Sequence, residues 1–155
     1  MVTVLIVYYS KTGNTEAMAR AVAEGASIEG VEVALKRVDY ANVFDVFLAS
    51  AVAFGSPCHF AYMSGALKAF FDRMPTLNTE FMEEIRRTPA VAFVCDGETD
   101  GAEEALFGIE KMLFHYLSFK HVSKGVVCKG KPSESKLNEC RELGQRLAKA
   151  AVDRS

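Results

Sequence analysis

The sequence lacks a long hydrophobic run, a strong net charge and any closely spaced cysteine pair. Its first apolar run ends after Tyr9, which is too short to span a bilayer, and Thr3 stands where a secretory signal would carry positive charge. We therefore expect a cytoplasmic protein with no membrane partner. The formal net charge of -2 predicts no nucleic-acid partner either, because such partners require a strongly basic surface.

The cysteine pattern excludes two further classes. The four cysteines are Cys58, Cys95, Cys128 and Cys140, and no two of them form a Cys-x-x-Cys pair. A cytosolic chain of this size needs no disulfide framework, so we expect most of these thiols to be buried as small hydrophobic side chains. The three histidines add no metal-ligand spacing, which predicts the absence of a zinc or iron–sulfur site.

Several phosphate-site signatures are also missing. No Gly-x-Gly-x-x-Gly or Gly-x4-Gly-Lys-Ser/Thr sequence occurs, which excludes the usual dinucleotide and nucleoside-triphosphate loops. A phosphoacceptor receiver domain needs carboxylates where this chain has Tyr9-Ser10-Lys11 and Gly55-Ser56. A cysteine-dependent phosphatase needs an arginine six residues after the cysteine, and neither Cys58 nor Cys95 has one.

The length and the hydrophobic pattern predict one α/β domain that spans residues 1–155. Apolar, β-branched runs predict five strands, at 2–8, 31–36, 49–54, 89–95 and 122–128. Helical spacing of apolar residues predicts helices at 16–29, 64–74, 102–118 and 137–152, with a short one at 80–86. Repeated strand–helix alternation predicts a doubly wound parallel sheet between two helical layers.

Ligands of such sheets bind beyond the carboxyl ends of the strands. The loops after the first, third and fourth predicted strands, at 9–15, 55–63 and 95–101, should therefore meet at one edge. The first loop contains Ser10-Lys11-Thr12-Gly13-Asn14-Thr15, where hydroxyls, an amide and a glycine lie between a strand and a helix. Helix N-terminal N–H groups attract anions, so this loop predicts a phosphate site. Simple N-capping by Ser10, Thr12 or Asn14 is the alternative.

The other two loops suggest a flat ligand. In the second, Gly55 and Pro57 predict a tight exit from the strand, which would display Phe60 and Tyr62 at the sheet edge for stacking. The alternative is that Phe60 only covers a helix end. In the third loop, two glycines would let the backbone approach a planar ring, whereas a plain acidic turn is the alternative. That loop is Cys95-Asp96-Gly97-Glu98-Thr99-Asp100-Gly101.

These motifs resemble those of known flavoproteins. Ser-x-Thr-Gly-Asn-Thr after the first strand resembles the phosphate loop of flavodoxins. The segment from Gly55-Ser56-Pro57 to Met63-Ser64-Gly65, followed by Leu67-Lys68 and Phe71-Asp72-Arg73, is similar to the WrbA-like and NADPH-dependent FMN reductase branch. The resemblance implies a flavodoxin-like fold, with a five-stranded sheet in the order 2-1-3-4-5, and non-covalently bound FMN.

The resemblance also implies roles for individual residues. The ribityl phosphate would be held by Ser10, Lys11, Thr12, Gly13, Asn14 and Thr15. The isoalloxazine would be lined by Pro57, Cys58, His59, Phe60, Tyr62 and Met63, and its pyrimidine side would be closed by Asp96, Gly97 and Gly101. No side chain need act as a nucleophile, since the chemistry belongs to the cofactor.

Two functions follow from the resemblance. The reductase-type second loop favours an NAD(P)H-dependent oxidoreductase that passes electrons through FMN to a quinone-like acceptor, with a homodimer completing the site. The short chain and the acidic third loop favour a flavodoxin-like carrier that exchanges electrons only with protein partners. Negative charge near the flavin would disfavour its anionic reduced form and could repel a nicotinamide dinucleotide. A scaffold that has lost FMN is a third alternative.

Overall fold

The structure is a computed structural model, and it describes residues 1–97 and 99–155. The elements run in the order β1 (Val2–Tyr8), α1 (Asn14–Ala26), β2 (Val31–Arg37), η1 (Val38–Tyr40), α2 (Val43–Leu48), β3 (Ala51–Pro57), α3 (Gly65–Asp72), α4 (Thr79–Arg87), β4 (Pro89–Asp96), α5 (Ala102–Glu110), η2 (Lys111–Tyr116), β5 (Lys120–His121), β6 (Val126–Lys129) and α6 (Glu134–Arg154). In this part of the chain, no helix combines the length and the apolarity that a membrane crossing requires.

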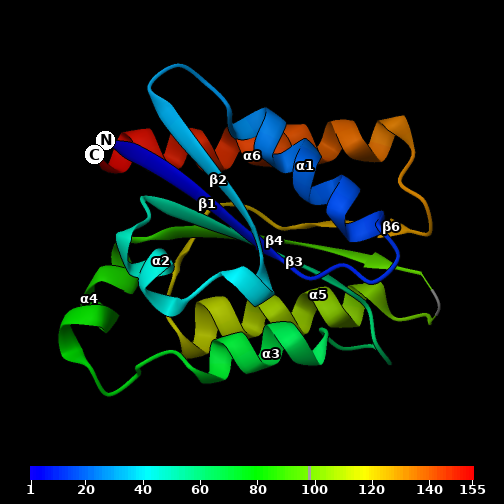
Figure 1. The fold of residues 1–155 in the computed structure, drawn as a ribbon, viewed down its shortest axis with the longest axis horizontal. Coiled ribbons are helices and arrows are strands. Elements are labelled where there is room, and N and C mark those ends of the chain that lie inside the picture. The colour runs from blue at the N-terminus through cyan, green and yellow to red at the C-terminus, as the bar shows by residue number, and fades with distance from the viewer. Residues whose placement is uncertain (98) are drawn as a thin grey trace.

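The strands form a parallel sheet in the order β2-β1-β3-β4-β5, with β6 also paired to β4. The predicted α/β fold class and strand order are therefore confirmed. Figure 1 shows α1 and α6 on one face of the sheet and α2 to α5 on the other. Both chain termini lie at the end of the sheet where β1 begins, opposite the edge at which the predicted ligand loops emerge.

Strand side chains alternate between two cores, as strand geometry requires. In β1, Val4 and Ile6 pack against the layer of α1 and α6, whereas Leu5 and Val7 pack against the layer of α2 to α5. All four side chains are buried. A strand that is buried on both faces reads as a continuous apolar run, which is why the sequence located β1 and β4 to within one residue. The third strand was predicted at 49–54 but spans Ala51–Pro57, so the expected exit at Gly55 and Pro57 lies within the strand.

Two glycines set how closely α1 and α6 approach each other. In the structure a Cβ on Gly25 would come within 1.9 Å of the Arg141 carbonyl oxygen in α6, and one on Gly144 would come within 2.1 Å of the Val22 carbonyl oxygen. The two glycines therefore allow α1 and α6 to pack backbone against backbone, side by side over the same face.

The predicted last strand, 122–128, is wrong in its bounds. The sheet position is filled by β5, which pairs with Pro89 and Ala90, and by β6, which pairs with the carboxyl half of β4. Between them, Gly125 lies where a Cβ would be 2.1 Å from the Ala92 carbonyl oxygen. This close approach, with the Gly125 N–H donated to Glu110 at 3.0 Å, replaces regular strand pairing.

Candidate functional site

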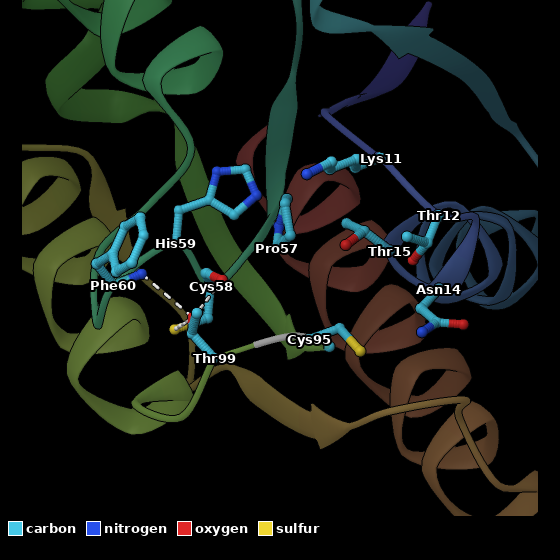
Figure 2. Close-up of a pocket in the computed structure, with 11 residues that line it drawn as sticks. Lys11, Thr12, Asn14, Thr15, Pro57, Cys58, His59, Phe60, Cys95 and Thr99 are labelled. Carbon is cyan, nitrogen blue, oxygen red and sulfur yellow. Dashed lines mark hydrogen bonds between the residues drawn. The ribbon is translucent and has the colours of Figure 1, made fainter.

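A cleft lies at the carboxyl edge of β1, β3 and β4, where the three predicted loops meet (Figure 2). It encloses about 210 Å³. Pockets that enclose a whole small ligand usually measure about 300–1,000 Å³, so a ligand of that size would keep one side exposed here. The cleft is lined by Lys11, Thr12, Asn14, Thr15, Pro57, Cys58, His59, Phe60, Cys95, Gly97 and Thr99.

The hydroxyl-rich side of the cleft is the first turn of α1. Gly13 precedes the helix with a φ of 98°, a left-handed conformation that glycine adopts without strain. The first-turn N–H groups of Asn14 and Thr15 have no intrahelical acceptor, because a helix leaves its first four N–H groups unpaired. Together with the Lys11 ammonium and the positive end of the helix dipole, these groups form a place for an anion.

Ser10 supports this turn from beneath and does not line the cleft. Its Oγ accepts the N–H of Gly13 at 3.1 Å and the N–H of Glu16 at 3.2 Å, and the residue is buried. The N-cap residue is Gly13, so the expected capping by Ser10, Thr12 or Asn14 is wrong in its position; Ser10 accepts the first-turn Glu16 N–H from outside the helix, while Thr12, Asn14 and Thr15 line the cleft. The loop therefore has one residue that supports the helix start and three that line the cleft, and the anion site stays a prediction.

Arg37 and Tyr9 brace the same loop, and neither was among the predicted site residues. Arg37 Nη1 donates to the Ser10 carbonyl oxygen at 2.9 Å, and its guanidinium lies 5.4 Å from the centroid of the Tyr9 ring. The Tyr9 ring in turn meets His59 edge-on, with centroids 6.4 Å apart. The strand register could have indicated this contact. Arg37 ends β2 in register with Tyr8, so its side chain emerges at the same edge of the sheet as the 10–15 loop.

The opposite side of the cleft is a tight hairpin over residues 59–62. His59 N–H donates to the Tyr62 carbonyl at 2.8 Å, and Tyr62 N–H donates back at 3.2 Å. Phe60 and Ala61 between them have φ values of 55° and 62°, the sign pattern of a type I′ turn. As expected, this geometry displays the aromatic residues: Phe60 is 87% exposed and Tyr62 is 42% exposed.

The third loop is tied to this hairpin. Thr99 Oγ1 donates to the Cys58 carbonyl at 3.1 Å and accepts the Phe60 N–H at 3.2 Å (Figure 2). Cys58 Sγ donates to the Asp100 carbonyl at 3.4 Å. The expectation of a plain acidic turn is therefore incomplete, because polar groups of this loop reach across to the second loop. Glu98, which contributed to the predicted acidic character, lies outside the described residues.

Cys95 forms part of the cleft wall and was missed as a site residue. Its Sγ donates to the Gly130 carbonyl at 3.0 Å, and burial raises the pKa of its thiol to about 12, with Cys128 beside it. At neutral pH the side chain is thus a neutral, weakly polar surface. A thiolate is the reactive form of cysteine, so Cys95 offers contact area and no nucleophile.

The remaining predicted residues are not part of the cleft lining. Ser10, Gly13, Tyr62, Met63, Asp96 and Gly101 do not line it. Met63 is 2% exposed and belongs to the core beneath α3, because the chain has already turned back toward that helix. Tyr62 packs near Gly108 of α5, and Gly101 packs against Ala61. Across residues 1–97 and 99–155, no group of three or more His, Cys, Asp or Glu residues is arranged to hold a metal ion.

Comparison with known proteins identifies the family. The family described as Flavodoxin matches residues 6–144. A flavodoxin of Aquifex aeolicus is 42% identical over 159 residues, which cover 94% of this chain and 84% of the relative. The chain belongs to the flavodoxin family. This family binds FMN, which agrees with a cleft that joins an anion site to an aromatic rim.

Solved structures support the same fold. A flavodiiron protein from Giardia intestinalis superposes with a TM-score of 0.84 at 25% identity; the match covers 98% of this chain but 36% of that one. A WrbA-like flavodoxin from Agrobacterium tumefaciens covers all of both chains with a TM-score of 0.81 at 22% identity. The second likeness concerns the fold alone. The comparisons therefore fit the carrier better than the WrbA-like reductase, and they do not show NAD(P)H as a co-substrate.

Proposed function

We propose that this flavodoxin-family chain binds FMN in the cleft and carries electrons between protein partners. The observation that carries the proposal is the pairing of two features: an anion site at the α1 N-terminus, and a cleft too shallow to enclose a whole cofactor. FMN has a phosphate group that would occupy the anion site. Its flat ring would lie in the shallow cleft. When bound, FMN supplies one- and two-electron redox chemistry.

The chain's own residues bind and orient the cofactor. Thr12, Asn14, Thr15 and Lys11 would surround the phosphate through hydroxyl, amide and ammonium donors. Pro57, Cys58, His59 and Phe60 would lie along the ring, with Gly97 and the protonated Cys95 on the far wall.

An exposed ring edge is what a protein-to-protein carrier requires. Phe60 is 87% exposed and lies at the rim of the cleft, where it would meet a partner surface that approaches the cofactor. The oxidoreductase that uses NAD(P)H remains the second candidate. It is favoured by the segment from Pro57 to Met63, whose residue types resemble those of FMN reductases.

One titration series tests the proposal and separates the two candidates. Purified protein is titrated with FMN, and binding is followed by quenching of flavin fluorescence; stoichiometric binding is expected. The complex is then mixed anaerobically with NADH or NADPH. We expect the flavin spectrum to stay oxidised, and dithionite to bleach it. Prompt bleaching by a nicotinamide would support the oxidoreductase instead, and failure to bind FMN would overturn both functions.

A further inference from the structure

We propose that Thr99 is a positioning residue, whose hydroxyl holds the 59–62 hairpin in the conformation that receives FMN. The inference rests on the FMN-binding function proposed above. Thr99 lines the cleft, and its side chain bonds to the second loop through the Phe60 N–H and the Cys58 carbonyl. It therefore acts on the cofactor through the hairpin's shape.

The hairpin needs such support because its turn is strained. Phe60 and Ala61 both have positive φ values, at 55° and 62°, although neither is a glycine or an asparagine. L-residues in this region have a Cβ too close to the backbone, and conformations of this kind persist only when surrounding contacts impose them. The two hydrogen bonds between His59 and Tyr62 close the turn, and contacts from outside the hairpin can add to them.

The Thr99 hydroxyl is well suited to impose this path. One oxygen atom accepts a hydrogen bond from Phe60 N–H at 3.2 Å and donates its own proton to the Cys58 carbonyl at 3.1 Å. The two bonded groups flank His59, so the hydroxyl fixes the peptide planes on both sides of that residue (Figure 2). Only a hydroxyl gives both a donor and an acceptor at this side-chain length. Serine could replace it, and valine, which has the same shape, could not.

Other contacts keep the base of the hairpin in place without Thr99. Cys58 N–H donates to the Cys95 carbonyl at 2.9 Å, which extends the β3–β4 pairing. At the other end, Ser64 N–H donates to the buried Ser56 Oγ at 2.8 Å. A Thr99→Val chain should therefore fold normally and lose order only at the tip, where Phe60 borders the cleft. Loss of order at the tip without loss of overall stability would distinguish a positioning role of Thr99 from a general contribution to stability.

The test compares Thr99→Val, Thr99→Ser and the native chain. Thr3→Val serves as the matched control, because Thr3 lies at the amino end of β1, away from the cleft. Three quantities are measured: the FMN dissociation constant, the circular dichroism of bound flavin, and hydrogen exchange at the Phe60 amide in the FMN-free protein. We expect Thr99→Val to bind FMN about tenfold more weakly, the equivalent of about one net hydrogen bond.

The other measurements decide between positioning and mere stability. Phe60 amide exchange should accelerate in Thr99→Val, its flavin dichroism should change, and its urea midpoint should match that of the native chain. Thr99→Ser should restore the FMN affinity, the flavin dichroism and the slow exchange of the Phe60 amide. Native-like FMN affinity in Thr99→Val, or equal losses in the serine and valine variants, would overturn the inference. If the native chain binds no FMN, the proposed function fails, whereas Phe60 exchange still shows whether Thr99 holds the hairpin.

Discussion

Gly101 and Ala61 pack against each other across two loops, so closely that a Cβ on residue 101 would lie 2.6 Å from the Ala61 Cβ. Real Cβ atoms do not approach this closely, and Gly101 also has a φ of 110°. The absence of a side chain at residue 101 thus lets the third loop lie directly against the strained turn of the 59–62 hairpin. The contact couples the start of α5 to one wall of the cleft.

Gly101→Ala should therefore push the hairpin away and destabilise the chain. The left-handed φ and the overpacking together predict a loss of about 2–4 kcal/mol in the free energy of unfolding. FMN affinity should fall as well, because Phe60 would move. Gly65→Ala is the matched control, since its Cβ would meet open space at the first residue of α3. Urea unfolding measures the loss of stability, and FMN titration measures the loss of affinity. Equal free energies of unfolding for Gly101→Ala and Gly65→Ala would contradict the expected destabilisation.

Arg37→Met should weaken FMN binding without touching the cofactor. The change removes the bond to the Ser10 carbonyl and the contact with the Tyr9 ring, and so loosens the 10–15 loop. We expect the FMN dissociation constant to rise about tenfold. A hydrogen bond from a charged donor contributes about 1.5–3 kcal/mol, and the loop retains its Ser10 contacts. Arg86→Met, on the exposed side of α4, should leave FMN affinity unchanged. Equal affinities for the two variants would show that Arg37 does not brace the loop.

The sequence predicted the parts of the site that depend on strand ends and local motifs. Buried strands are apolar runs, so the meeting of the three loops at one edge could be predicted from the sequence, although β3 runs on to Pro57 where the sequence predicted an exit at Gly55. The 10–15 loop was recognised because its hydroxyls, glycine and amide occupy consecutive positions. Confirmation of the flavodoxin family agrees with that motif. Local chemistry in consecutive residues is what a sequence displays directly.

The parts that escaped prediction depend on contacts between distant segments. A type I′ turn is normally announced by Asn-Gly or Asp-Gly, whereas Phe60 and Ala61 give no such signal. Thr99 and Gly101, about 40 positions further on, determine this turn. Arg37 escaped for a related reason, because its contact with the Ser10 carbonyl spans 27 residues. Residues that act through such long-range contacts can be identified only from the three-dimensional arrangement of the loops.

Thr12→Val combined with Thr15→Val should weaken FMN binding at the phosphate end. Each hydroxyl that bonds to a charged group contributes about 1.5–3 kcal/mol, so the pair predicts at least about a hundredfold loss of affinity. Riboflavin, which lacks the phosphate, should bind the native and double-variant chains equally. Thr3→Val is again the control, because it makes the same chemical change far from the cleft. Unchanged FMN affinity would mean that the phosphate is held elsewhere.

Arg154 ties the end of α6 to the amino-terminal side of the sheet. Its Nη1 donates to the Ser50 carbonyl at 2.9 Å and to Thr88 Oγ1 at 3.3 Å, and it is paired with Glu84. Arg154→Met should lower the free energy of unfolding by about 2–3 kcal/mol, since partly buried acceptors lose a charged donor. Arg146→Met, on the exposed face of the same helix, should change it by less than about 0.5 kcal/mol. FMN affinity should stay constant in both, because Arg154 lies at the opposite end of the sheet.

Cys140 should make stability fall in alkaline solution. The residue is fully buried between α6 and the sheet, and burial raises the pKa of its thiol from 9.0 to about 12. Between these values the unfolded chain has released the proton while the folded chain retains it. The unfolded state then binds fewer protons, so stability is complete below pH 9 and declines as the pH rises toward 12, by up to about 1.4 kcal/mol per pH unit.

Comparison with Cys140→Ala isolates this contribution, because lysines, tyrosines and the other thiols titrate in both chains. The alanine variant should be less stable at pH 8 by about 1 kcal/mol, since it loses buried apolar volume. Between pH 9 and pH 11 the difference between the two chains should shrink and then reverse, because only the native chain must keep a buried thiol protonated. Urea unfolding at each pH gives both free energies. A difference that stays constant over this range would show that the Cys140 thiol titrates alike in the folded and unfolded chains.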